Sequence, residues 1–157
     1  MSSSAARLPV VKCHIPQAML DRLVPLAEKA GSALGRTVER AAVIRAAITA
    51  WLHHTKNLPI PELGRAIRVA TRVTRGSNCR RVTVRWTENT ARCLVERAHD
   101  VRPWLGHEPP PTALVRAALA FWIDTAELCT ADVLAQEILP AIELRGRKKE
   151  TFPRTPN

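Results

Sequence analysis

The sequence has no tyrosine, only two phenylalanines, and four cysteines that never form a C-x-x-C pair. Without tyrosine, the chain cannot supply the tyrosine nucleophile of a DNA-nicking enzyme. Because the cysteines stand far apart and the five histidines lack zinc-finger spacing, we expect reduced thiols and no metal site. The sequence also lacks a recognisable Ser-His-Asp or Cys-His set and a glycine-rich phosphate loop, so we expect neither an enzyme nor a cofactor.

Long apolar runs are absent as well. The amino-terminal stretch MSSSAARLP contains no apolar signal region. No uncharged run approaches the ~18 residues that cross a membrane. The sequence thus predicts a cytoplasmic protein with no membrane partner, and residues 1–8 are expected to be disordered.

What the chain has in excess is positive charge. Its 157 residues include 24 Lys and Arg against 14 Asp and Glu, which gives a formal net charge of +10. An excess of this size indicates a polyanionic partner. The hydrophobic content of 46% is that of a folded domain.

The sequence repeats itself when it is shifted by 71 residues. Eleven positions are identical between residues 9–55 and 80–126, and the apolar positions coincide as well. The identical pairs are Val11/Val82, Leu23/Leu94, Val24/Val95, Ala27/Ala98, Leu34/Leu105, Gly35/Gly106, Ala42/Ala113, Arg45/Arg116, Ala46/Ala117, Ala47/Ala118 and Trp51/Trp122. A repeat that keeps its apolar pattern in register indicates a duplicated structural unit.

Each copy begins with a strand and a first helix. In residues 10–16 and 80–86, apolar and polar side chains alternate with period 2, which is typical of a strand. Pro16 suits the first turn of the following helix in one copy, and Thr87 is a suitable N-cap in the other. Pro25 then predicts a kink or an early end of the first helix near residue 24.

The apolar face of this first helix is expected to include Val24 in one copy and Val95 in the other. Glycines at the end of each first helix separate it from a second helix with a wide apolar stripe. That second helix is predicted to end near His54 in the first copy and near Leu128 in the second.

A single strand has no ladder partner, and a unit of about 45 residues cannot cover its own apolar face. Two copies remove both problems, because their strands can pair antiparallel while four helices cover the inner side. We therefore predict a mostly α-helical fold with one two-stranded antiparallel ribbon. In this fold, residues 9–55 and 80–128 form one domain.

This pattern resembles the ribbon-helix-helix family of DNA-binding proteins. The resemblance rests on the alternating strands, on IPQAMLDRL at the start of the first helix, and on GRTVERAAVIRAAI across the turn and the second helix. The tandem arrangement is similar to single-chain members among plasmid conjugation and DNA-transfer accessory proteins. It implies two ribbon-helix-helix units fused in one chain as an intramolecular pseudo-dimer.

In that family, the ribbon enters the major groove of double-stranded DNA and its outward side chains touch base edges. The resemblance implies base reading by six residues: Val10, Lys12 and His14 from the first unit, and Arg81, Thr83 and Arg85 from the second. Arginine suits guanine O6 and N7, and threonine offers a hydroxyl and a methyl group for thymine. An ordinary exposed strand face carries similar residues, so this interpretation depends on the fold. Because the two halves differ, the expected DNA site is asymmetric.

The family also binds backbone phosphate at the start of the second helix, through free N–H groups and the helix dipole. The corresponding residues here are Arg36, Thr37, Val38 and Arg40, with Thr112 in the second unit. Glu39 departs from the pattern, because a carboxylate repels phosphate. The second unit also departs from it, because the prolines of HEPPPT at residues 107–112 remove three N–H donors.

Residues 56–79 form a basic linker, in which Arg65, Arg68, Arg72 and Arg75 recur at helical spacing. On a helix these arginines would form one stripe, a candidate for sequence-independent contacts with DNA phosphates. Two alternatives stay open. The stripe is merely a solvated face, or the β-branched residues at positions 69, 71 and 73 form a strand.

A short helix is expected over residues 129–144, with Thr130 as its N-cap and Pro140 as a stop or kink. Residues 145–157 form a basic tail. This tail is either a disordered arm that grips the DNA backbone or a solubilising end.

These features favour a sequence-specific double-stranded DNA-binding protein that is associated with nucleoid or plasmid DNA. It would be either a transcriptional repressor or a DNA-transfer accessory factor. Further copies of the chain side by side on DNA, and a relaxase or another protein, are the partners that such a role would involve. Two alternatives stay open: a non-specific or RNA-directed binder, and an antitoxin-type interaction module that uses residues 129–157.

Overall fold

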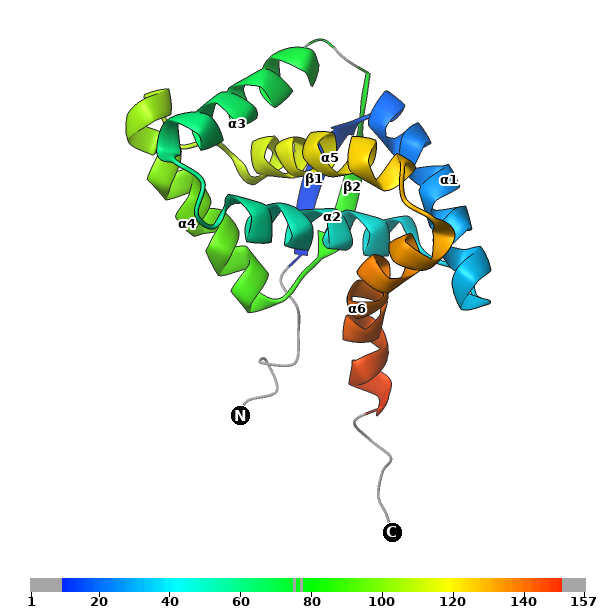
Figure 1. Ribbon diagram of the computed structural model, residues 1–157. Helices are drawn as coiled ribbons and strands as arrows, with labels where there is room; N and C mark the ends of the chain where they lie inside the picture. The colour runs from blue at the N-terminus through cyan, green and yellow to red at the C-terminus, as the bar shows by residue number, and fades with distance from the viewer. Residues whose placement is uncertain (1–9, 75, 77, 151–157) are drawn as a thin grey trace.

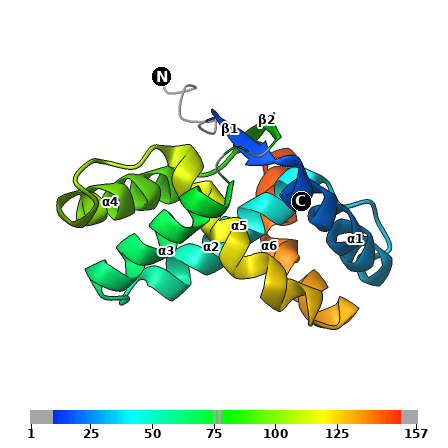
Figure 2. The same cartoon turned by 90° about the horizontal axis from the view of Figure 1, so that it is seen from above.

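The computed structural model describes residues 10–74, 76 and 78–150, of which 143–150 are described by their backbone alone. The expected disorder of residues 1–8 and the end of the basic tail, 151–157, lie outside this part of the chain. The elements follow in the order β1 (Val10–Pro16), α1 (Gln17–Leu34), α2 (Arg40–Thr55), α3 (Ile60–Thr74), β2 (Cys79–Arg85), α4 (Glu88–Leu105), α5 (Pro111–Glu127) and α6 (Ala131–Glu150). The two strands form a ribbon on one side of the molecule, and the helices lie on the other side (Figures 1 and 2). The fold is mostly helical with one two-stranded antiparallel sheet, as predicted.

The ribbon pairs strands that lie far apart in the sequence. Val10 lies opposite Arg85, and Pro16 lies opposite Cys79. The inward side chains of both strands are buried over the helices, as period-2 alternation predicts; they are Cys13, Ile15, Val82 and Val84. Trp86 follows β2 and is also buried, at 2% exposure.

The first helix of each half has the same length and the same ending. α1 and α4 both contain 18 residues. They end at Gly35 and Gly106, which have φ of 68° and 88°, a left-handed conformation that favours glycine. Thr87 caps α4 as predicted, because its hydroxyl accepts a hydrogen bond from the Thr90 backbone N–H at 3.0 Å.

Two expectations for these helices need correction. Of the two outcomes expected of Pro25, a kink or an early end, the early end is wrong, because α1 continues to Leu34. The helix continues because Leu26 and Ala30, beyond the proline, are buried, and this packing outweighs the lost backbone hydrogen bond. Val24 and Val95 are not part of the buried faces, since they are 50% and 62% exposed.

The second helices lie beneath the ribbon and pack against each other. α2 ends at Thr55 and α5 at Glu127, each one residue from the predicted end. Both helices place a tryptophan in the core, Trp51 at 1% and Trp122 at 2% exposure. Burial of these large rings on both helices fuses the two halves into one hydrophobic core.

The linker contains a helix rather than a strand. α3 buries Leu63, Ile67 and Ala70 against α4 and α5, the helices of the other half. α6, which follows the second half in the sequence, packs on α1 and α2, the helices of the first half. Its buried residues Leu134, Ile138 and Ala141 stand 71 positions after those of α3 and are identical to them. The repeat therefore continues through a third helix in each copy, and each third helix covers the opposite half. A helix over residues 129–144 was predicted and one in the linker was left open, but their equivalence and their crossing between halves were not predicted.

α6 also differs from its predicted extent. It begins at Ala131, after Thr130, whose hydroxyl accepts a hydrogen bond from the Val133 N–H as predicted for an N-cap. Pro140 does not stop it, and the helix runs to Glu150, so residues 145–150 of the predicted tail belong to it. Ile138 and Ala141, on either side of the proline, are buried and hold the helix in place. None of the described helices is long and apolar enough to cross a membrane.

An ion pair on the surface joins α1 to the end of α5. The Arg22 guanidinium lies 2.6 Å from a Glu127 oxygen and 2.7 Å from an Asp124 oxygen. Arg22 holds the pKa of Glu127 below its ordinary value, through a hydrogen bond and through its charge. A lowered folded-state pKa means that the pair stabilises the fold at neutral pH and that this contribution is lost as the pH falls through that pKa. Because these groups are exposed, the contribution is small.

Candidate nucleic-acid interface

The outward side chains of the ribbon form three cross-strand pairs. Val10 faces Arg85, Lys12 faces Thr83, and His14 faces Arg81. We call these six residues the outer ribbon face. They are the six residues that the family resemblance implies for base reading, and the strand register brings all of them together on one exposed surface.

The outer ribbon face is exposed and its polar side chains are free to bind a partner. Within the described part of the chain, no hydrogen bond or ion pair engages the side chains of Lys12, His14, Arg81, Thr83 or Arg85. Neither strand contains an aspartate or glutamate. Unpaired cations held side by side on a rigid ribbon repel one another, and a polyanion relieves that repulsion.

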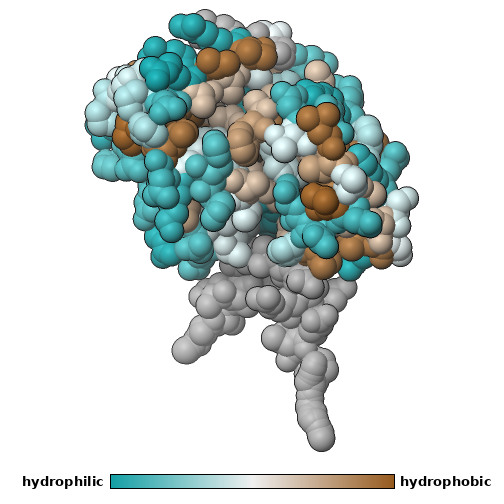
Figure 3. All heavy atoms as spheres, viewed as in Figure 1, coloured by the Kyte–Doolittle hydropathy of each residue, from teal (hydrophilic) through white to brown (hydrophobic). Residues whose placement is uncertain are grey.

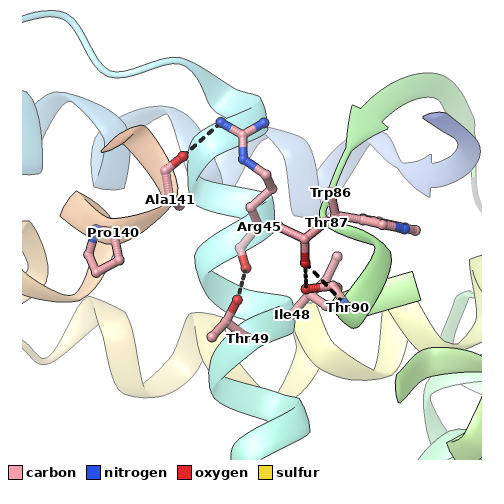
Figure 4. A pocket seen from close by; sticks show the side chains of 8 residues that line it. All are labelled: Arg45, Ile48, Thr49, Trp86, Thr87, Thr90, Pro140 and Ala141. Atoms are coloured by element: carbon pink, nitrogen blue, oxygen red, sulfur yellow. Dashed lines mark hydrogen bonds between the residues drawn. The ribbon is translucent and has the colours of Figure 1, made fainter. Parts of the chain in front are cut away.

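Two equivalent arginines hold the ribbon from below. Arg116 on α5 donates a 2.8 Å hydrogen bond to the His14 carbonyl of β1. Arg45 on α2 donates to the Arg85 carbonyl of β2 at 3.5 Å and to the Ala141 carbonyl of α6 at 3.1 Å, the second of which is drawn in Figure 4. Arg45 and Arg116 are 71 positions apart, and so are the two strand residues they hold.

The supporting role of Arg45 and Arg116 was not predicted. One signal in the sequence could have revealed it: the two arginines are identical between the repeats and stand within otherwise apolar helix stripes. Arg45 is only 8% exposed. A buried arginine with backbone partners on two other elements fixes their relative position.

Thr112, predicted to contact phosphate, lies below the ribbon. Burial raises the pKa of the Cys13 thiol, and a hydrogen bond with the Thr112 side chain lowers it by less. The Thr112 side chain thus lies close to an inward side chain of β1. The thiol stays protonated at neutral pH and packs as a small apolar group.

The start of α2 carries most of the other predicted phosphate contacts. Arg36, Thr37 and Arg40 are exposed around it, and Glu39 is the N-cap residue. Val38 is buried at 7% exposure, so it can offer only its backbone. The start of α5 differs, because Pro110 is its N-cap residue and Pro111 its first residue. Prolines there remove the N–H donors that an anion would bind.

The predicted arginine stripe lies on α3. Arg65, Arg68 and Arg72 are exposed, and Arg75 lies outside the described residues. The Arg68 guanidinium stacks over Trp104 of α4, 4.5 Å from the ring centroid. Trp104 packs closely on α3, since a Cβ atom added to Gly64 would come within 2.3 Å of the ring. The stripe is therefore anchored to the rest of the domain.

The tryptophans have limited surface for stacking on bases. Trp51, Trp86 and Trp122 are buried in the core. Trp104 is partly buried and covered by Arg68.

On the face turned away from the ribbon, apolar side chains are scattered among hydrophilic ones (Figure 3). In the described part of the chain, no three His, Cys, Asp or Glu side chains gather as a metal site.

Searches against protein-family models, curated proteins and solved structures found no match for this chain. The case for a function therefore rests on the geometry and charge of the outer ribbon face and of the helix ends beside it.

Proposed function

We propose that this chain is a sequence-specific double-stranded DNA-binding protein that inserts its ribbon into the major groove. The observation that carries the proposal is the outer ribbon face, with six outward residues in three cross-strand pairs and no partner for its polar side chains among the described residues. A two-stranded ribbon fits the width of the major groove. Arg81 and Arg85 would each grip a guanine, and Thr83 would contact a thymine methyl group or a base edge.

The ribbon would be presented by two ribbon-helix-helix units that form a pseudo-dimer within one chain. Three observations support this arrangement. The first helices begin and end 71 positions apart, Arg45 and Arg116 hold equivalent strand carbonyls, and each third helix covers the opposite half. Each is expected of two copies related by an approximate two-fold axis.

The two ends of the ribbon differ, and this difference would make the DNA site asymmetric. A two-fold axis would exchange the Val10–Arg85 pair with the Arg81–His14 pair. Arginine is therefore present at both ends, but its neighbour is valine at one end and histidine at the other. An asymmetric site suits an oriented element such as a transfer origin better than a palindromic operator.

Phosphate contacts beside the groove would position the ribbon without reading sequence. Arg36, Thr37 and Arg40, with the backbone of Val38, would supply them at the start of α2. Each phosphate that these exposed cations neutralise releases counterions, so the affinity for DNA should fall steeply as the salt concentration rises.

Selection of binding sites from random duplex DNA tests this function. We expect a single asymmetric motif, and binding to it that weakens by about 0.9 log units per log unit of salt for each phosphate contacted. RNA of the same sequence should compete poorly. Failure to enrich any motif, or equal competition by RNA, would instead support a non-specific or RNA-directed binder.

A further inference from the structure

A second basic site lies beside the ribbon, in a pocket of about 350 Å³. Its walls come from α3, from the loop between α4 and α5, and from the start of α5. The polar groups that matter for a ligand, which together define what we call the basic pocket, are Arg68, Arg72, His107, Thr112 and Arg116.

The basic pocket is prepared for an anion. It has three arginines and no aspartate or glutamate among its lining residues. Arg68 is held in place by the ring of Trp104. Arg72 has no hydrogen-bond or ion-pair partner among the described residues, so its five N–H donors are available. Arg116 already donates to His14, Thr74 and Cys79, and it adds its charge to the pocket from a fixed position.

The basic pocket also adjoins the outer ribbon face. Arg116 lines it and donates to the backbone of His14, one of the outward residues. Thr112 also lines it and lies close to Cys13, which precedes His14 in β1. If the bases of a DNA duplex contacted the His14–Arg81 end of the ribbon, the sugar–phosphate backbone of that duplex would therefore pass beside this pocket.

The two α3 arginines of the basic pocket have no arginine at the equivalent positions of the other half. Arg68 corresponds to Leu139 and Arg72 to Glu143 under the shift of 71 residues. The two halves are thus complementary. The first half keeps N–H donors at the start of its second helix, whereas the second half has prolines at that start and packs against α3, which carries Arg68 and Arg72.

We propose that the basic pocket holds one backbone phosphate of the bound DNA, and that α3 side chains replace the helix N–H donors that the prolines remove. This inference rests on the proposed function and names how the second half is anchored. The chain then grips its two flanking phosphates with different residues: the start of α2, with Arg36, Arg40 and the Val38 backbone, on one side, and the α3 arginines on the other. Since the two grips share no residue, each can be removed separately.

The experiment measures the salt dependence of binding to the selected duplex for the full chain and for Arg72→Ala. Arg72 has no partner within the described protein, so its loss should leave folding intact, which the thermal unfolding temperature checks. We expect the salt slope to fall by about 1, with equal weakening on the selected and on unrelated duplexes. Ethylation of one flanking phosphate should interfere with the unaltered protein and no longer with the variant.

Arg65→Ala is the matched control, because it removes the same charge from the same helix outside the basic pocket. It should retain the ethylation interference and lose less of the salt slope. If Arg72→Ala keeps the full slope and interference while the unaltered protein binds its selected motif, the pocket inference falls and the proposed function stands. If the unaltered protein binds no duplex, both fall.

Titration of the free protein with inorganic phosphate separates the two sources of the anion. We expect saturation only at millimolar concentrations or above, because a single phosphate lacks the contacts of the duplex. Micromolar binding that is lost in Arg72→Ala would show a small-molecule effector site instead and would overturn the assignment to DNA.

Discussion

Replacing Arg81 or Arg85 with alanine is expected to weaken binding to the selected DNA site by about 1–3 kcal/mol each, roughly 5- to 150-fold. The loss arises because each arginine would donate two hydrogen bonds to one guanine. Specificity should relax at one base pair for each variant, and at different base pairs for the two, since the residues lie at opposite ends of the ribbon. Competition binding against a panel of singly substituted duplexes measures both effects.

Arg81→Lys is the informative control for this experiment. Lysine keeps the charge but lacks the planar fork that binds guanine with two hydrogen bonds. We therefore expect this variant to lose discrimination at its base pair while its salt slope stays unchanged. If Arg81→Lys discriminates as well as the unaltered protein, Arg81 acts only as a charge beside phosphate, and base reading by this residue is wrong.

Replacing Trp51 or Trp122 with alanine is expected to lower the free energy of unfolding by about 3–5 kcal/mol. Both rings are at most 2% exposed, and the indole N–H of Trp122 also donates to Glu137 of α6. The total free energy of unfolding of a domain of this kind is about 5–15 kcal/mol, so either variant should be only marginally folded. Urea unfolding followed by circular dichroism measures the loss.

The same unfolding curves test whether the two halves form one cooperative unit. Because α2 and α5 pack against each other and the third helices cross between halves, each substitution should shift a single transition. Val95→Ala, at an exposed position of α4, should change the free energy of unfolding by less than about 0.5 kcal/mol. Two separate transitions, with only one of them shifted by Trp51→Ala, would contradict the shared core.

Much of the fold followed from the repeat. Period-2 alternation in two distant segments predicted strands that need each other, and the register pairs those segments antiparallel. Helix ends were predictable where local chemistry decides them, as at Gly35, Gly106 and Thr87. The outward residues of the ribbon followed as well, because alternation fixes which side chains share a face.

Features that depend on packing between distant elements were not predictable. Proline rules suggested that Pro25 and Pro140 would kink or end their helices, and neither ends its helix, because buried neighbours on the same helices outweigh one missing hydrogen bond. The crossing of α3 and α6 between halves leaves no local pattern, although the identity of Leu63 and Leu134 was a signal for the third helix. Val24 and Val95 occupy equivalent positions of the two copies, yet both face solvent, because apolar character alone does not decide burial.

The central claim is that the ribbon lies in the major groove, and methylation interference on the selected duplex tests it most directly. Methylation of guanine N7 blocks the major-groove edge that arginine would bind. The account predicts interference at guanines unequally placed on the two sides of the site, with one of them insensitive to methylation in Arg81→Ala and another in Arg85→Ala. Binding that tolerates methylation at every guanine N7, or that is blocked only by methylation of adenine N3 in the minor groove, would contradict it.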